Sequence, residues 1–143
     1  MSIESIIRIY NRAQDHMTNP KLRREDGKYI VRFYEGLQDA CKLVITSFGG
    51  ELKLKKNHLT SITKMTPPTD FEHLVSQYNE SFEKAEKISS SLDLEKSWDG
   101  YYRGYSHNIL QVMDYLGYEP TFKSEITLKN LTGFRRRSNE DLP

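Results

Sequence analysis

The sequence has a single cysteine, Cys41, among its 143 residues. One thiol cannot form an intrachain disulfide, and such chains are typical of reducing compartments. No stretch approaches the ~20 apolar residues that a membrane span requires. The apolar part of residues 1–10 is interrupted by Glu4 and Arg8, unlike a signal peptide. We therefore expect a soluble, cytoplasmic protein that does not enter a membrane.

Motifs for catalysis and for metal or phosphate binding are also missing. The four histidines are scattered singly, without H-x-x-x-H or H-x-E spacing, and no CxxC accompanies them. Gly49-Gly50 is not followed by Lys-Ser/Thr, and neither G-x-G-x-x-G nor G-x-S-x-G occurs. Cys41 falls on an apolar stripe, where a thiol is usually inert core filling. We expect no catalytic residue, no metal and no cofactor, and hence a protein that is not an enzyme.

What the sequence does contain is apolar residues at the three- and four-residue spacing of a helical face. Four stretches have this pattern: residues 2–17, 29–47, about 69–88, and from Leu94 or Trp98 to Leu116. Their ends carry helix signals, namely Ser2 as an N-cap, Thr69-Asp70-Phe71-Glu72 as a capping box, and Gly49-Gly50 and Gly117 as C-terminal caps. Residues 28–34 are also rich in strand formers, so a strand followed by a shorter helix remains the alternative there.

Two further segments have strand character. Leu52 and Leu54 alternate with lysines, which predicts a hairpin over residues 51–65. Residues 121–128 read as a strand that pairs with this hairpin, and residues 129–143 as a flexible tail. The expected fold is mainly α, four helices with a small β-hairpin or sheet addition, within one domain over residues 1–128. An α+β fold is the alternative.

Charge is distributed unevenly along the chain. Residues 18–66 carry ten Lys and Arg against five Asp and Glu, whereas residues 67–120 carry four against ten. The two halves either neutralise each other by packing or present one charged half to a partner.

The segment from Trp98 to His107 combines four large aromatic residues with two glycines spaced four apart, Gly100 and Gly104. Each glycine costs a helix ~1 kcal/mol relative to alanine. Close helix packing, a ligand or a protein partner would offset this cost. Since Tyr, Trp and Arg are enriched at interfaces, the residues predicted to bind a partner are Trp98, Tyr101, Arg103 and His107.

Basic residues form three further groups, which predict an alternative nucleic-acid-binding surface. They are Lys21, Arg23 and Arg24 in the polar connector after the first helix, Lys53, Lys55 and Lys56 on the expected hairpin, and Arg135, Arg136 and Arg137 in the expected tail. If they converge, they can contact several phosphates, and binding would weaken steeply with salt. Acidic neighbours such as Glu25-Asp26 and Glu140-Asp141 reduce the net positive charge of these groups. This favours a solvated charged surface over a nucleic-acid-binding one.

No motif identifies a family. In its general character, short, charged and tyrosine-rich, the sequence resembles small accessory proteins of phages and other mobile elements. This favours a small non-enzymatic interaction protein, an inhibitor or modulator of a larger macromolecular machine, whose partner is another protein. The alternatives are a nucleic-acid-binding regulator, and a nucleotide- or small-ligand-binding protein with a pocket between two copies of the chain.

Overall fold

The computed structural model describes residues 2–19, 27–91, 96–124 and 128–137. Its elements are helices α1 (Ile3–Met17), α2 (Gly27–Ser47), α3 (Glu72–Ser90) and α4 (Ser97–Tyr115), and strands β1 (Glu51–Lys55), β2 (His58–Thr63), β3 (Tyr118–Ser124) and β4 (Lys129–Arg136). The strands form two separate antiparallel hairpins, β1–β2 and β3–β4. The predicted mainly α fold with a small β addition is confirmed.

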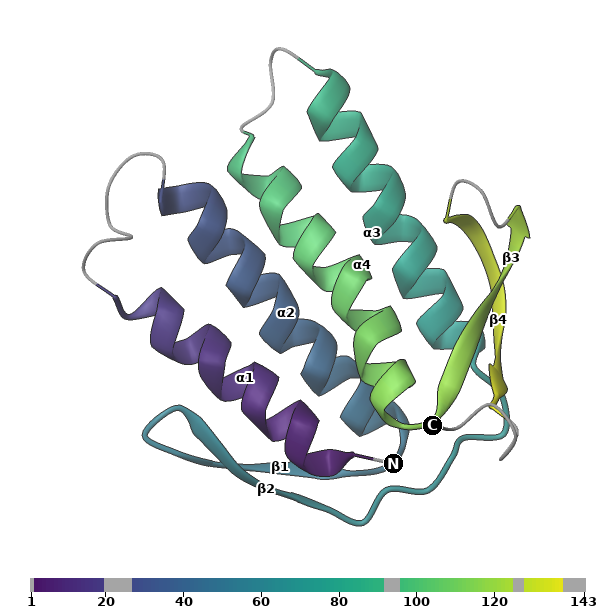
Figure 1. The fold of residues 1–143 in the computed structure, drawn as a ribbon. Helices are drawn as coiled ribbons and strands as arrows, with labels where there is room; N and C mark the ends of the chain where they lie inside the picture. The colour runs from purple at the N-terminus through teal and green to yellow at the C-terminus, as the bar shows by residue number, and fades with distance from the viewer. Residues whose placement is uncertain (1, 20–26, 92–95, 125–127, 138–143) are drawn as a thin grey trace.

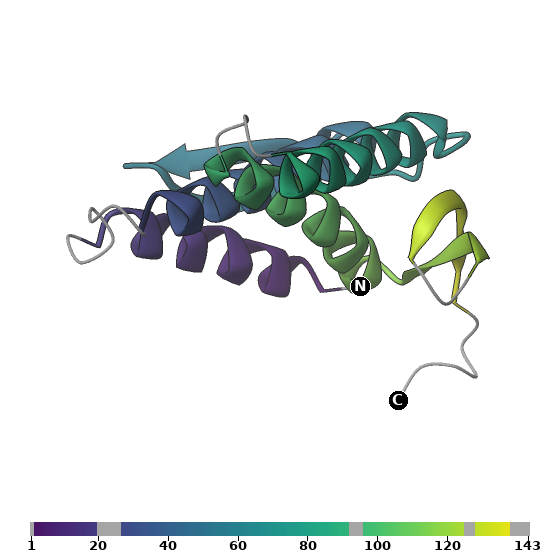
Figure 2. The same cartoon turned by 90° about the horizontal axis from the view of Figure 1, so that it is seen from above.

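The helices lie side by side in the order α1, α2, α4, α3, so that α4 is inserted between α2 and α3 (Figure 1). The β1–β2 hairpin packs against α1, and the β3–β4 hairpin lies at the opposite end, against α3 (Figures 1 and 2). All four helices and strands β2, β3 and β4 contribute to one buried core, whose members include Ile6, Tyr10, Val44, Ile45, Leu59, Leu74, Ile109, Met113, Tyr118 and Leu131. In the part of the chain described, no helix is long and apolar enough to cross a bilayer.

The ends of three helices agree with their sequence signals. Ser2 is the N-cap of α1, and its hydroxyl accepts a hydrogen bond from the Ser5 N–H at 3.4 Å. Gly49 (φ +73°) and Gly117 (φ +93°) adopt the left-handed conformation just beyond α2 and α4, as glycine C-terminal caps do. The region 28–34 is helical throughout, so the strand alternative is wrong.

The start of α3 differs from the predicted capping box. The N-cap residue is Phe71, and Asp70, not Thr69, accepts a hydrogen bond from the Glu72 N–H at 3.1 Å. An aspartate side chain readily bonds to the backbone two residues ahead. This local bond satisfies one of the free N–H groups of the first turn in place of the longer-range box.

The β1–β2 hairpin is confirmed, and its turn explains the pairing of Lys55 with His58, although the register shifts further along, between Lys53 and Leu54. Lys56 (φ +53°) and Asn57 (φ +68°) both have positive φ angles, as a two-residue type I′ turn demands. Such a turn matches the twist of the two strands that it connects.

The C-terminal region differs from expectation in two ways. The strand expected over residues 121–128 begins earlier, at Tyr118, and pairs with β4 instead of with the β1–β2 hairpin. Residues 129–136, expected to belong to a flexible tail, form β4, with Leu131 buried in the core. Residues 138–143 of that expected tail lie outside the described residues.

Helices α2 and α4 approach each other so closely that their backbones touch. A Cβ atom at Gly36, Gly100 or Gly104 would lie less than 3.0 Å from the backbone of the facing helix, a separation that real Cβ atoms essentially never show. The atoms in the way are the carbonyl oxygens of Tyr101 and Phe33 for Gly36 and Gly104, and that of Tyr29 for Gly100. Intrachain packing therefore explains both glycines of α4, without a partner.

Candidate functional site

Helix α4 has neighbours on two sides, which leaves two exposed faces. Gly100 and Gly104 face α2, whereas α3 packs on the other side. Arg103, His107 and Leu110, at spacings of four and three residues, lie on one exposed face. Trp98 and Tyr101 lie on the other, so the structure does not bring the four predicted partner-binding residues together.

The aromatic face is formed by Trp98, Tyr101, Tyr102 and Tyr105, whose side chains are already engaged with the protein itself. The Arg32 guanidinium lies over the Trp98 ring at 4.2 Å, and the Tyr101 hydroxyl donates to the Asp39 carboxylate at 2.5 Å. Burial is the main cause of a raised pKa in both Tyr101 and Tyr105, and the pKa of Tyr105 is about 12. These phenols remain protonated at neutral pH and connect α4 to its neighbours.

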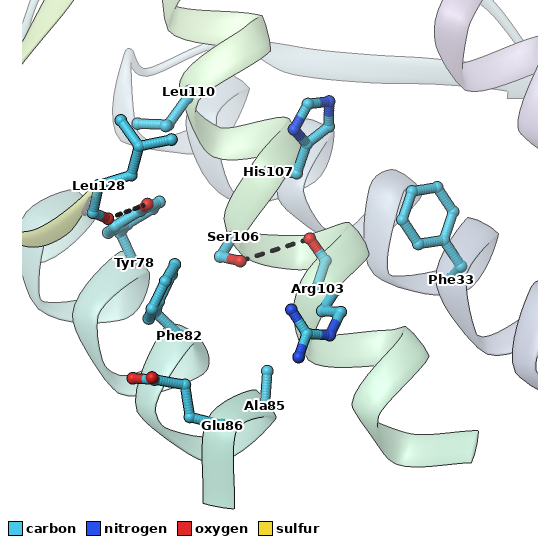
Figure 3. A pocket seen from close by; sticks show the side chains of 10 residues that line it. All are labelled: Phe33, Tyr78, Phe82, Ala85, Glu86, Arg103, Ser106, His107, Leu110 and Leu128. Carbon is cyan, nitrogen blue, oxygen red and sulfur yellow. Dashed lines mark hydrogen bonds between the residues drawn. The ribbon is translucent and has the colours of Figure 1, made fainter. Parts of the chain in front are cut away.

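The other face contains an open hollow of about 340 Å³, which we call the α4 groove (Figure 3). Helix α4 forms the floor of the groove. Phe82 of α3 and Phe33 of α2 lie on its opposite sides, and Leu128 lies at one end. Tyr78, Ala85 and Leu110 add further apolar surface. Leu128 is 50% exposed, and its carbonyl oxygen accepts a hydrogen bond from the Tyr78 hydroxyl at 2.8 Å, which fixes this end of the groove.

The groove lining includes one arginine, one glutamate and one histidine, and the first two are paired. The Arg103 Nε donates to Asp99 at 2.7 Å, and its Nη2 donates to the Ser89 hydroxyl at 2.8 Å. Glu86 forms an ion pair with Lys129 at 2.6 Å. The exposed His107 makes no hydrogen bond or ion pair with any described residue. Because its ring remains available, His107 can donate to or accept from a molecule in the groove.

Cys41 is placed as the sequence predicts, on the core side of α2. Its side chain is fully buried, and burial raises the pKa of the thiol to about 12. Only a thiolate is an effective nucleophile, so Cys41 is inert in the folded chain. Within the described ranges, no three His, Cys, Asp or Glu side chains gather as the ligands of a metal ion would.

Of the three basic groups, Lys21, Arg23 and Arg24 lie outside the described residues, and the other two lie at opposite ends of the molecule. Lys53, Lys55 and Lys56 are on the β1–β2 hairpin, whereas Arg135 to Arg137 end the β3–β4 hairpin (Figures 1 and 2). Arg135 is paired with Glu119, and Arg137 with Asp114 at 2.7 Å. The arginine run thus retains little uncompensated charge, and these two groups do not form one basic surface.

A third feature was not singled out by sequence reasoning. Arg8 and Arg12 of α1 line a polar hollow of about 190 Å³ between α1 and α4, together with Gln111 and Tyr115. Both arginines are exposed, and neither forms an ion pair with a described residue. The available signal was their four-residue spacing, which places two like charges on one side of a helix and is unfavourable by itself.

Comparison of the chain with protein-family models, with curated proteins and with solved structures finds no match.

Proposed function

We propose that the chain is a small non-enzymatic interaction protein that binds another protein through the α4 groove. The observation that carries this proposal is the groove itself, an apolar hollow open to solvent, with a histidine on its rim that has no hydrogen bond or ion pair to a described residue. Exposed apolar surface surrounded by polar groups is typical of interaction sites.

An open groove suits a partner's side chain better than it suits an enclosed small ligand. The exposed parts of Leu128, Arg103 and His107 lie at the rim, where a second surface can cover them. Small-molecule sites usually bury most of their ligand, whereas protein partners anchor single large side chains in such pockets. The fully buried thiol of Cys41 offers no competing nucleophile for a catalytic role.

The proposal is tested by selection from a display library of random peptides against the immobilised chain. Selected peptides are then measured against Leu128→Asn and His107→Ala, which remove an apolar wall and the unpaired rim group. Asparagine tolerates the positive φ of position 128 (+52°), so the first variant should fold. We expect both variants to weaken the selected peptides by about tenfold or more.

Trp98→Ala on the aromatic face is the matched control, since it removes a larger exposed side chain far from the groove. Peptide affinity should be unchanged in this variant. The opposite result would refute the α4 groove as the binding site. If every selected peptide loses affinity for Trp98→Ala but not for the groove variants, the binding site is the aromatic face.

A further inference from the structure

The hollow beside Arg8 and Arg12 adjoins the α4 groove across a single ridge of α4. Leu110 lines the groove and the next residue, Gln111, lines the hollow. His107 and Gln111 are one helical turn apart, which is about 6 Å along the axis. From Arg103 to Gln111 the ridge is about 12 Å long. One short segment of a partner can therefore reach both sites at once.

The side chains that line the groove and the hollow include three arginines, Arg8, Arg12 and Arg103, and one carboxylate, Glu86. Three acidic side chains have basic partners, Asp99 with Arg103, Glu86 with Lys129, and Asp114 with Arg137, whereas Glu4, one turn before Arg8 on α1, forms no ion pair with a described residue. Arg8 and Arg12 are left without an acidic partner among the described residues. Their guanidinium groups present donors in the fixed planar geometry that suits a carboxylate.

The neutral groups of the hollow also favour an anion. The Gln111 Nε2 donates to the Tyr115 hydroxyl at 3.0 Å, so this hydroxyl has its own proton left to donate. Tyr115 is held in place from the backbone side as well, since its carbonyl oxygen accepts from the Ser2 N–H at 2.8 Å. Two arginines and a tyrosine with a free hydroxyl proton thus line one polar hollow.

On the basis of the proposed function, we infer that the partner segment is acidic and amphipathic. Its apolar side chain fills the α4 groove, and its carboxylates bind Arg8 and Arg12 on the other side of the ridge. A nucleic acid fits less well, because two unpaired arginines neutralise only two phosphates and the adjoining groove is apolar. The lysines of the β1–β2 hairpin lie on another part of the molecule (Figure 1).

The sequences and affinities of the peptides selected on the wild-type chain test this inference. We expect them to be enriched in Asp and Glu next to Leu, Ile or Phe, and to bind more weakly as salt rises. Arg8→Gln with Arg12→Gln should weaken these peptides by about tenfold. Lys53→Gln with Lys55→Gln is the matched control, because it removes the same charge from exposed positions far from the groove and should leave affinity unchanged.

The two proposals fail in different ways. Peptides that depend on Leu128 and His107, but show no acidic enrichment and no loss in the arginine double variant, refute the acidic partner and leave the groove as the binding site. Peptides that are indifferent to Leu128 and His107 refute both. A single-stranded oligonucleotide that binds more tightly than the selected peptides, and that depends on Arg8 and Arg12, identifies a nucleic acid as the partner and overturns the inference.

Discussion

The thiol of Cys41 lies between α2 and α4, beside a fully buried asparagine. The Asn108 Nδ2 lies 3.1 Å from the Cys41 Sγ and donates to the Leu37 carbonyl at 2.7 Å. This side chain therefore joins the two central helices by a polar contact within an apolar core. Because an interior polar group is costly without its hydrogen bonds, the Asn108 Nδ2 favours the packing of α4 against α2 that keeps the Leu37 carbonyl within reach, whereas its Oδ1 has no hydrogen-bond partner among the described residues.

We predict that Cys41 does not react with a thiol reagent such as DTNB while the chain is folded. Its pKa of about 12 keeps it protonated at neutral pH, and the surrounding helices exclude the reagent. In denaturant the thiol should react at the rate of a free cysteine, and this rate is the internal control. Rapid stoichiometric labelling of the native chain would contradict the buried placement.

We predict that Gly104→Ala destabilises the chain by about 1–3 kcal/mol, as overpacking does. Alanine improves helix propensity by ~1 kcal/mol, but its Cβ would collide with the Phe33 carbonyl, a backbone atom that cannot rotate away. The measurement is the free energy of unfolding in urea.

Gly49→Ala is the control for that substitution. Its Cβ would meet no atom within 4 Å, so only the positive φ of +73° opposes it, at about 1–2 kcal/mol. A chain in which Gly104→Ala is as stable as the wild type would show that α2 and α4 can separate without cost.

At the scale of elements, each hairpin is attached to a helix by one asparagine. The Asn11 side chain of α1 bonds to both the N–H and the C=O of Leu59 in β2, at 2.6 and 2.9 Å. The Asn79 side chain of α3 does the same to Leu131 in β4, at 2.9 and 3.0 Å. In each case the asparagine amide makes the two backbone hydrogen bonds that a neighbouring strand would otherwise make, and it makes them to a leucine buried in the core.

We predict that Asn79→Ala destabilises the chain by about 1–3 kcal/mol, because it leaves the N–H and C=O of Leu131 without their partners. Hydrogen exchange of the Leu131 amide should accelerate, while that of the Leu59 amide stays slow. Asn11→Ala should show the reverse pattern, so that each variant serves as the control of the other. Equal acceleration at both amides would mean that the two hairpins open together.

The β1–β2 hairpin has a second, pH-dependent attachment to α1. The His58 Nε2 lies 2.7 Å from the Asp15 Oδ1, and this hydrogen bond is the main cause that raises the pKa of His58. The protonated form is favoured by folding, so the stabilisation is fully present below the ordinary histidine pKa of about 6.5. It is lost as the pH rises through the higher pKa of the folded chain.

We therefore predict that His58→Gln costs stability at a pH of about 5.5 and little at a pH of about 8. Urea unfolding of both proteins at the two pH values measures the difference. His73→Gln is the matched control, because it makes the same substitution at an exposed histidine in the first turn of α3 that forms no ion pair with a described residue. The proposed pairing is contradicted if the cost of His58→Gln is the same at both pH values.

Most helix boundaries can be predicted from the sequence because they depend on local signals such as Ser2, Gly49 and Gly117. The pairing of β3 with β4 could not be predicted in this way. A register shift between Thr121 and Phe122 interrupts the ladder. In β4 the apolar residues Leu131 and Phe134 are three apart, so the two-residue alternation that identifies a strand is missing.

At the scale of the whole molecule, the candidate surface depends on which elements flank α4. The sequence placed Arg103 and His107 among the residues of interest, but grouped them with Trp98 and Tyr101, because their segment is continuous. The helical period of 3.6 residues already turns Arg103 and His107 away from Trp98 and Tyr101, and α2 and α3 cover the sides of α4 that lie between the two pairs. Phe33 and Phe82 fit apolar stripes in the sequence, and nothing local indicates that part of each stripe borders a groove.

The insertion of α4 between α2 and α3 has a consequence for the order in which the chain can fold during its synthesis. Helix α2 makes its closest contact with α4, yet the β1–β2 hairpin and the whole of α3 are translated between them. When a nascent chain has emerged from the ribosome only as far as α3, α4 is still missing. The side of α2 that contains Gly36 is then not covered by its partner helix. Non-local contacts of this kind form late. A stalled ribosome would therefore present a folding intermediate with exposed apolar surface on α2, which chaperones are expected to recognise.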